Sequence, residues 1–145
     1  MKELFECLLG NDEIVRMRAA DALEKVCRGR PDLVAPFTDR LLVEVSKIEQ
    51  PSVQWHLAQM LSELVLAGKD RRRAIAILKR NLSRSEDWIV VNLTLEALAV
   101  FVRQSPRMRT SFAKTLRAHL HSRHKSVARR AGKLLSELGP GGPVS

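Results

Sequence analysis

The chain has 145 residues, of which 45% are hydrophobic and 4% aromatic, and its formal net charge at pH 7 is +9. This length and apolar content suit one folded domain and exclude a largely disordered chain. No apolar run approaches the roughly 18 residues of a membrane span, and the first residues lack the apolar stretch of a secretory signal. Two cysteines are too few for a disulfide framework and indicate a reducing interior. We therefore predict a cytoplasmic protein without membrane association.

Apolar residues recur at intervals of three and four along nearly the whole chain, which predicts helix almost throughout. Glycine and proline interrupt this pattern at several places and divide it into eight short helices. Four of these are first helices of a repeated pair, expected over 4–9, 36–48, 72–82 and 108–120. Each is followed by a second helix, and the leading residues of the second helices are Val15, Val53, Val90 and Val127.

The second helices repeat one another at a nearly constant period. Their leading valines are 38, 37 and 37 residues apart, and the leucines Leu23, Leu61, Leu98 and Leu135 have the same spacings. Four such units predict an all-α fold, an α-solenoid of stacked helical hairpins. The expected domain is 1–139, with units at about 1–30, 31–68, 69–105 and 106–139. Residues 140–145, which are rich in glycine and proline, are expected to form a disordered tail.

These units resemble the HEAT-repeat family of armadillo-like helical proteins over residues 1 to about 139. The likeness is carried by Asp12, Val15-Arg16, Ala19-Ala20 and Ala22-Leu23, and by Pro36 in a first helix. The turn aspartate recurs as Asp87 but is replaced by Gln50 and His124, so no uniform ladder of Asp and Arg is expected. The resemblance implies a right-handed superhelical stack whose second helices line the concave side. It implies no chemistry, because such repeats serve mostly as scaffolds.

One exposed stripe is expected along the second helices, opposite their apolar faces. Its members at equivalent positions of the four units are Met17 and Asp21, Trp55 and Gln59, Asn92 and Glu96, and Arg129 and Lys133. Because tryptophan is costly to leave in water and often anchors partners, Trp55 is the main candidate for binding a protein or peptide. The alternative is that Trp55 fills a gap between helices or covers His56. Trp88 lies in a turn, where we expect it to pack as a staple.

Basic charge is concentrated toward the C-terminal end. Residues 1–63 carry a net charge of −3, residues 64–96 carry +3, and residues 97–145 carry +9. Such a gradient favours an anionic partner. The candidate anion-binding residues are Arg71, Arg72 and Arg73 in mid-chain and Arg129, Arg130 and Lys133 near the end. Stacking aromatics are few, so a duplex backbone suits them better than a single strand. The alternatives are a solvated face or contact with an acidic protein.

No metal, cofactor or catalytic site is expected. The histidines His119, His121 and His124 do not share one helix face, and the adjacent Arg123 and Lys125 would repel a cation. Cys7 and Cys27 are expected to be small core residues. Nucleophile-elbow, phosphate-loop and zinc-protease motifs are absent from the sequence. Some alkylpurine DNA glycosylases are HEAT-like, but Trp55 with Asp21 or Glu96 is only a loose parallel to their sites.

Two functional hypotheses remain, with a third possibility about the extent of the chain. The first is a non-enzymatic scaffold that binds a protein or peptide on the concave face, with an acidic partner as one option. The second is a module that binds nucleic acid through the basic C-terminal repeats. The third possibility is that these residues are one segment of a longer solenoid, because terminal units usually carry polar caps and the first helix here does not.

Overall fold

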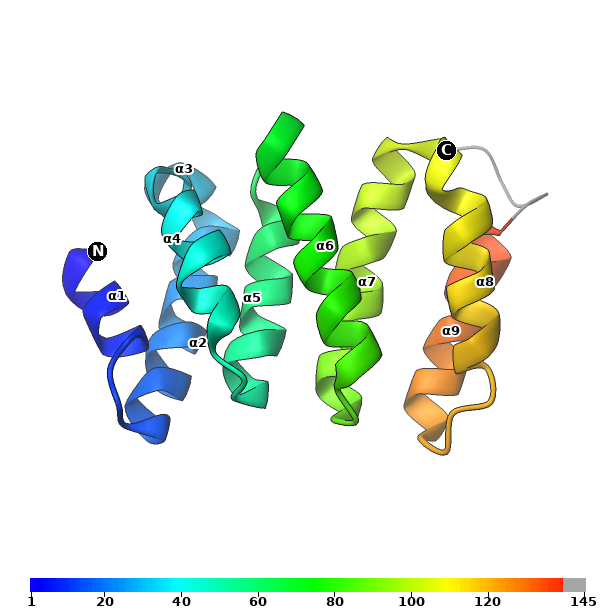
Figure 1. The fold of residues 1–145 in the computed structure, drawn as a ribbon, viewed down its shortest axis with the longest axis horizontal. Helices are drawn as coiled ribbons and strands as arrows, with labels where there is room; N and C mark the ends of the chain where they lie inside the picture. The colour runs from blue at the N-terminus through cyan, green and yellow to red at the C-terminus, as the bar shows by residue number, and fades with distance from the viewer. Residues whose placement is uncertain (140–145) are drawn as a thin grey trace.

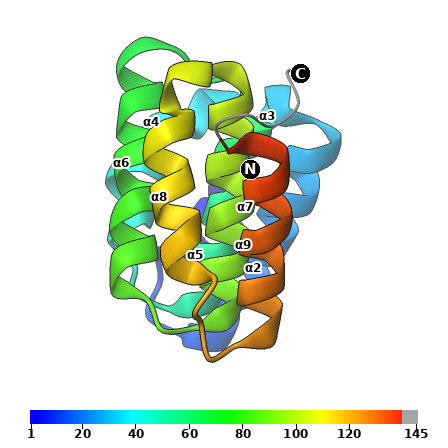
Figure 2. The ribbon, with the colours of Figure 1, turned by 90° about the vertical axis from the view of Figure 1, so that its right-hand side faces the viewer.

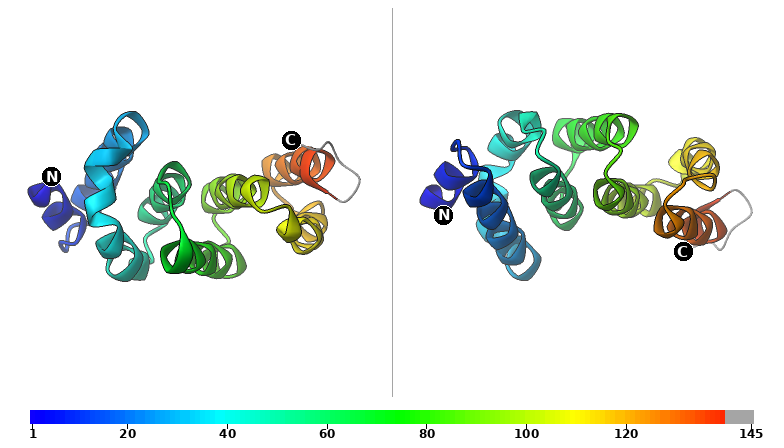
Figure 3. Two further views of the ribbon diagram at one scale, coloured as in Figure 1. Left: turned by 90° about the horizontal axis from the view of Figure 1, so that it is seen from above. Right: turned by 90° about the horizontal axis from the view of Figure 1, so that it is seen from below.

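The computed structural model describes residues 1–139, and all regular structure in this range is helical. The helices lie side by side along the long axis of the molecule (Figure 1) and form two rows (Figures 2 and 3). The first-helix row, in front in Figure 1, contains α4 (Thr38–Val43), α6 (Gly68–Arg84) and α8 (Arg109–His119). The second-helix row contains α2 (Glu13–Gly29), α5 (Pro51–Glu63), α7 (Trp88–Gln104) and α9 (Lys125–Leu138). The predicted all-α class is confirmed.

Packing within the second-helix row is continuous, whereas the first-helix row is interrupted. Helix α2 contacts α5, α5 contacts α7, and α7 contacts α9. Helix α1 (Lys2–Leu8) packs on α2, while α6 packs on α7 and α8 packs on α9. In the first-helix row α4 packs against α6, but α6 and α8 are not among the packed helix pairs of residues 1–139. The buried apolar side chains lie mainly between the two rows and form one continuous core.

The residues at the turns determine where the second helices begin. The Asp12 carboxylate accepts hydrogen bonds from the backbone N–H groups of Ile14 (2.9 Å) and Val15 (3.1 Å) at the start of α2. Asp87 caps α7 in the same way. Such caps satisfy N–H groups that the first helical turn leaves unpaired. Helix α5 instead begins with Pro51, whose missing N–H costs nothing at this position.

The first helix of the second unit differs from its predicted form. Instead of one helix over 36–48, the structure has α3 (Pro31–Val34), a 3₁₀ turn (Ala35–Phe37), α4 and a second 3₁₀ turn (Val45–Lys47). Pro36 supplies no N–H to continue an α-helix, which explains the first break. The Phe37 ring then stacks on Phe5, with 4.7 Å between the ring centroids. If these pieces are counted as one broken helix, the eight predicted helices are confirmed.

Hydrogen bonds and ion pairs between units recur at one sequence separation. The pairs 34 residues apart include Arg16–Gln50, Ser46–Arg80, Asn92–Ser126 and Arg103–Glu137. The sequence period is 37 or 38 residues. A partner 34 residues away therefore lies three or four residues, about one helical turn, before the equivalent position in the next unit. Each unit is therefore joined to the next with a similar shift, of about one helical turn, between the bonded positions.

The exposure of Val15 and the predicted tail at 140–145 need separate comment. Val15 was expected on the apolar face of its helix but is 42% exposed. Its counterparts Val53, Val90 and Val127 are buried; no second helix precedes α2 in residues 1–139, so nothing covers Val15 in the same way. The predicted tail at 140–145 lies outside the described residues. None of the helices in residues 1–139 combines the length and apolar character needed to cross a membrane.

Arg71 ties the start of α6 to the end of α7. Its guanidinium donates hydrogen bonds to the carbonyl oxygen of Phe101 (3.0 Å) and to Oγ of Ser105 (2.9 Å). It also lies over the Phe101 ring, 5.3 Å from the centroid, which is favourable cation–π geometry. Arg71 was expected to bind an anion; because one amino group of its guanidinium is engaged within the fold, it is a weaker candidate than predicted.

We expect Arg71→Ala to lower the free energy of unfolding by about 2 kcal/mol, because it removes charge-assisted hydrogen bonds in a half-buried site. Arg72→Ala is the matched control, since Arg72 is the exposed neighbour and carries the same charge. That change should cost less than about 0.5 kcal/mol. Urea unfolding of both variants measures the difference. Equal losses of stability would contradict the structural role of Arg71.

Candidate functional site

Much of the predicted stripe on the second-helix row is engaged in contacts between helices. Glu96 forms an ion pair with Arg130 at 2.9 Å. Asn92 was expected to be exposed; this is wrong, since it is 5% exposed and donates to Oγ of Ser126 over 3.1 Å. The cause is α9, which packs on α7 and covers Asn92. Arg130 therefore has much of its charge neutralised and is a weaker anion-binding candidate than predicted.

Asp21 is also engaged. Its carboxylate accepts a hydrogen bond from Lys25 over 2.9 Å and lies 3.4 Å from Nε2 of His56 on α5. The hydrogen bond from Lys25 and the nearby His56 hold the pKa of Asp21 below its ordinary value. Both carboxylates considered for a glycosylase-like site, Asp21 and Glu96, are thus paired with basic side chains.

Trp55 and its nearest stripe residues remain accessible. Trp55 and Gln59 are half-buried on α5, and Met17 on α2 is 40% exposed. The Trp55 ring is tilted against His56, with 5.6 Å between ring centroids. Trp88 is 48% exposed at the first position of α7, which is more than a packed staple would show. The prediction for Trp88 is therefore wrong.

Basic side chains without an acidic partner gather in the last unit. Exposed residues of this unit that form no ion pair within the described part of the chain are Arg107, Lys114, Arg117, Arg123, Lys125, Arg129 and Lys133. Lys125, Arg129 and Lys133 are four residues apart on α9 and follow one line in steps of about 6 Å. In the mid-chain cluster, Arg73 pairs with Asp39 at 3.2 Å and Asp70 at 3.7 Å. Only Arg72 of that cluster is exposed and unpaired in residues 1–139.

The three histidines lie near the turn between α8 and α9. Nδ1 of His119 lies 2.9 Å from the carbonyl oxygen of Thr115, one helical turn earlier. His124 stands at the N-cap of α9, and its backbone N–H donates to Oγ of Ser122. Over residues 1–139, no group of three His, Cys, Asp or Glu side chains is arranged to hold a metal ion.

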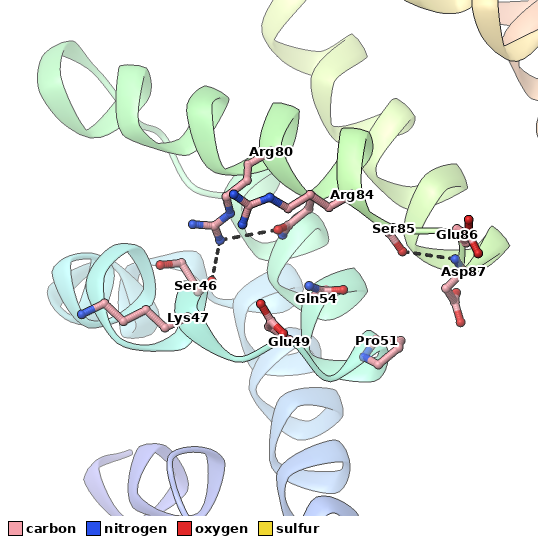
Figure 4. Close-up of a pocket in the computed structure, with 11 residues that line it drawn as sticks. Ser46, Lys47, Glu49, Pro51, Gln54, Arg80, Arg84, Ser85, Glu86 and Asp87 are labelled. Carbon is pink, nitrogen blue, oxygen red and sulfur yellow. Dashed lines mark hydrogen bonds between the residues drawn. The ribbon is translucent and has the colours of Figure 1, made fainter.

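A polar crevice of about 470 Å³ lies where the turn before α5 meets the end of α6 (Figure 4). One amino group of Arg80 donates to the carbonyl oxygen of Ser46 over 2.6 Å and lies 3.5 Å from Oδ1 of Asn81. Arg80 is therefore fixed in the wall. The other charged lining residues are Lys47, Glu49, Arg84, Glu86 and Asp87. Since both signs are present, the crevice does not select for the charge of a ligand.

A larger cleft of about 760 Å³ lies between α6 and α8. Its floor is apolar and includes Leu98 and Val102 of α7, while Lys79, Arg107 and Lys114 stand among its lining residues. Sequence reasoning missed this cleft. The signal available in the sequence was the stretch between Glu96 and Glu137. It contains no acidic residue but has apolar positions such as Met108 and Phe112.

A buried pair of carboxylates also went unnoticed in the sequence. Glu24 of α2 is buried, and one carboxylate oxygen of Glu63 on α5 is buried without a hydrogen-bond partner. Burial, together with the hydrogen bond and charge of Glu24, raises the pKa of Glu63 to about 8. Burial likewise raises the pKa of the neighbouring Cys27 thiol to about 12, which makes it a poor nucleophile at neutral pH. Cys7 was also expected in the core, which is wrong because it is exposed.

Comparison of the chain with protein-family models, curated proteins and solved structures finds no match. The resemblance to HEAT repeats therefore rests on the residues and period of this chain alone.

The Glu63 pair predicts a dependence of stability on pH. Because the pKa of Glu63 rises from 4.5 to about 8 on folding, the native state holds a proton that the unfolded chain releases between these values. The stabilisation that this bound proton gives the native state is complete below pH 4.5 and is lost as the pH rises through about 8. When the pH is raised from about 5 to about 9, we expect the free energy of unfolding to fall less in Glu63→Gln than in the wild type.

Urea unfolding at both pH values measures this difference. Glu6→Gln, at an exposed position of α1, is the control and should follow the wild type. Parallel losses in all three proteins would show that Glu63 does not titrate in this range.

Proposed function

We propose that the chain is a HEAT-like α-solenoid, with the right-handed stack that the resemblance implies, and acts as a non-enzymatic scaffold. The solenoid is supported by the period of about 37 residues, by the common 34-residue separation of contacts between units and by the two rows of helices. The two cysteines, neither in a disulfide, suit a reducing compartment such as the cytoplasm.

We propose the second-helix row as the binding face, with a protein or peptide as its partner. The observation that carries this proposal is Trp55, a large aromatic side chain left partly open on α5 in the interior of the row. Aromatic anchors of this kind dominate the energetics of many interfaces. Gln59, one helical turn along α5, adds accessible surface beside the indole, and Met17 on the neighbouring α2 is also exposed.

The charges of the same row orient the partner. Arg129 and Lys133 on α9 are exposed and unpaired within residues 1–139. Helix α9 lies two helix spacings from α5, which is about 20 Å at ordinary interaxial distances. A segment that packs an apolar side chain against Trp55 and carries acidic groups about 20 Å away would match both features.

Substitution of Trp55 tests this scaffold proposal. We expect Trp55→Ala to weaken binding of the cellular partner by about tenfold or more, because the change removes an apolar anchor worth about 2 kcal/mol. Trp88→Ala is the matched control: it removes the other tryptophan, which lies at the start of α7. Quantitative affinity capture should recover a partner with the wild type and Trp88→Ala that is depleted with Trp55→Ala. Equal recovery with all three would refute the anchor.

A second candidate function is binding to duplex nucleic acid. It is favoured by the line of Lys125, Arg129 and Lys133, which have no acidic partner in the described part of the chain. If these three residues contact phosphates, the logarithm of the binding constant should fall with the logarithm of salt concentration with a slope of about −3.

Fluorescence anisotropy with labelled duplex DNA, with RNA and with polyglutamate measures that slope. Arg129→Glu with Lys133→Glu should remove most of the duplex affinity. Lys47→Glu with Arg18→Glu makes the same charge change at exposed positions elsewhere and should leave most of it. Equal, weak binding to all three polyanions would exclude nucleic acid and leave the protein-binding proposal.

A further inference from the structure

The cleft between α6 and α8 lies on the first-helix row, away from the surface around Trp55. In Figure 1, α7 is visible behind the space between these two helices. Helix α4 packs directly on α6, but no such packing joins α6 to α8 in residues 1–139. The interruption leaves a cleft of about 760 Å³ on the side opposite the proposed binding face.

The cleft has an apolar floor and one closed end. Leu82 of α6, Leu98 and Val102 of α7, and Phe112 of α8 form the apolar lining. Met108, in the turn before α8, lines one end of the cleft, and its sulfur lies 4.0 Å from the Arg71 guanidinium that ties α6 to α7. Leu98 and Val102 are themselves buried, so the apolar surface from which a ligand displaces water belongs to Met108, Leu82 and Phe112.

The charged lining of the cleft has one sign. Lys79 stands on α6, Arg107 precedes α8 and Lys114 lies on α8; all three are exposed, and none forms an ion pair within residues 1–139. No acidic residue is found among the lining residues in the described part of the chain. The cleft therefore offers an apolar surface with positive charge on both sides, which complements an amphipathic anionic ligand.

The placement of the charges distinguishes a peptide from a lipid-like molecule. A fatty acid carries its charge at one end, so its site would gather the basic groups there. Here Arg107 lies near one end of the cleft, Lys114 lies within α8 and Lys79 stands on the opposite wall. The lined part of α8, residues 111–119, is about 13 Å long, or two and a half helical turns. Repeated negative charges along such a length are a property of a helix with acidic flanks.

We propose that this cleft is a second docking site and binds an acidic amphipathic helix of a partner protein. Leucine-like side chains on one face of that helix contact Leu82, Met108 and Phe112. Glutamate or aspartate on its flanks pairs with Lys79 and Lys114. This is helix-in-groove recognition, in which apolar anchors supply affinity and the rim charges supply orientation. The site does not depend on Trp55, so it stands or falls independently of the proposed function.

The probe is a fluorescein-labelled peptide of about 14 residues, or four helical turns, with leucine at helical spacing and glutamate on the flanks. A scrambled peptide of the same composition and a peptide with lysine in place of glutamate are the ligand controls. Dodecanoate is the competitor that represents a small anionic amphiphile. Anisotropy with the full chain measures binding, and circular dichroism confirms that each variant is folded.

Lys79→Glu with Lys114→Glu should weaken binding of the amphipathic peptide by about tenfold or more. Ala118→Trp, at an exposed lining position, should block the cleft without changing its charge. Lys125→Glu with Lys133→Glu on α9 is the matched charge control and should retain binding, as should Trp55→Ala. Binding with this pattern of losses supports the site.

Several outcomes would overturn the proposal. Equal affinity for the scrambled peptide would mean that charge alone attracts the ligand. Equal loss in the α9 control variant would place the peptide elsewhere. Binding of dodecanoate in the cleft without binding of the peptide would assign the site to small amphiphiles. No detectable peptide binding up to about 100 μM would remove the docking site altogether.

Discussion

The structure depends on one constraint: each helical pair buries its apolar face against its neighbours, because a single pair cannot enclose a core. The continuous packing of α2, α5, α7 and α9 satisfies this constraint, and the largest fully buried side chains come from this row and from α1, α4, α6 and α8. Small residues such as Ala58 and Ala131 are buried where they allow close approach. Side chains on the exposed faces of the helices make fewer of these packing contacts, so they are available for contact with other molecules.

The hydrogen bonds between units show how a constant repeat is kept without a uniform ladder. The turn residues of the four units are Asp12, Gln50, Asp87 and His124, so no single type of side chain recurs at every turn. Different chemistry serves the same geometry: Arg16 donates to Gln50 in one place, and Asn92 donates to Ser126 in another. The common separation of 34 residues fixes the offset between units, while the identities of the bonded groups vary.

The sequence predicted the helices well because their determinants are local or periodic. The caps at Asp12 and Asp87 and the spacing of leading valines could be recognised without coordinates. The site was less predictable, since a helical wheel treats each helix alone. Asn92 lies opposite an apolar face but is covered by α9, and Arg71 belongs to a charged run but binds a carbonyl of α7. The cleft depends on the distance between α6 and α8, which a sequence period does not determine.

The interrupted first-helix row has a mechanical consequence. A rod with two continuous rows resists bending in every direction, but a rod with one row broken bends most easily toward and away from the break. Here the last unit is joined to the third mainly through the contact of α7 with α9, while Arg71 and Met108 hold one end of the break. In residues 1–139 this junction is therefore held by α7 and α9 in the second-helix row and, in the first-helix row, by contacts at the Met108 end of the cleft.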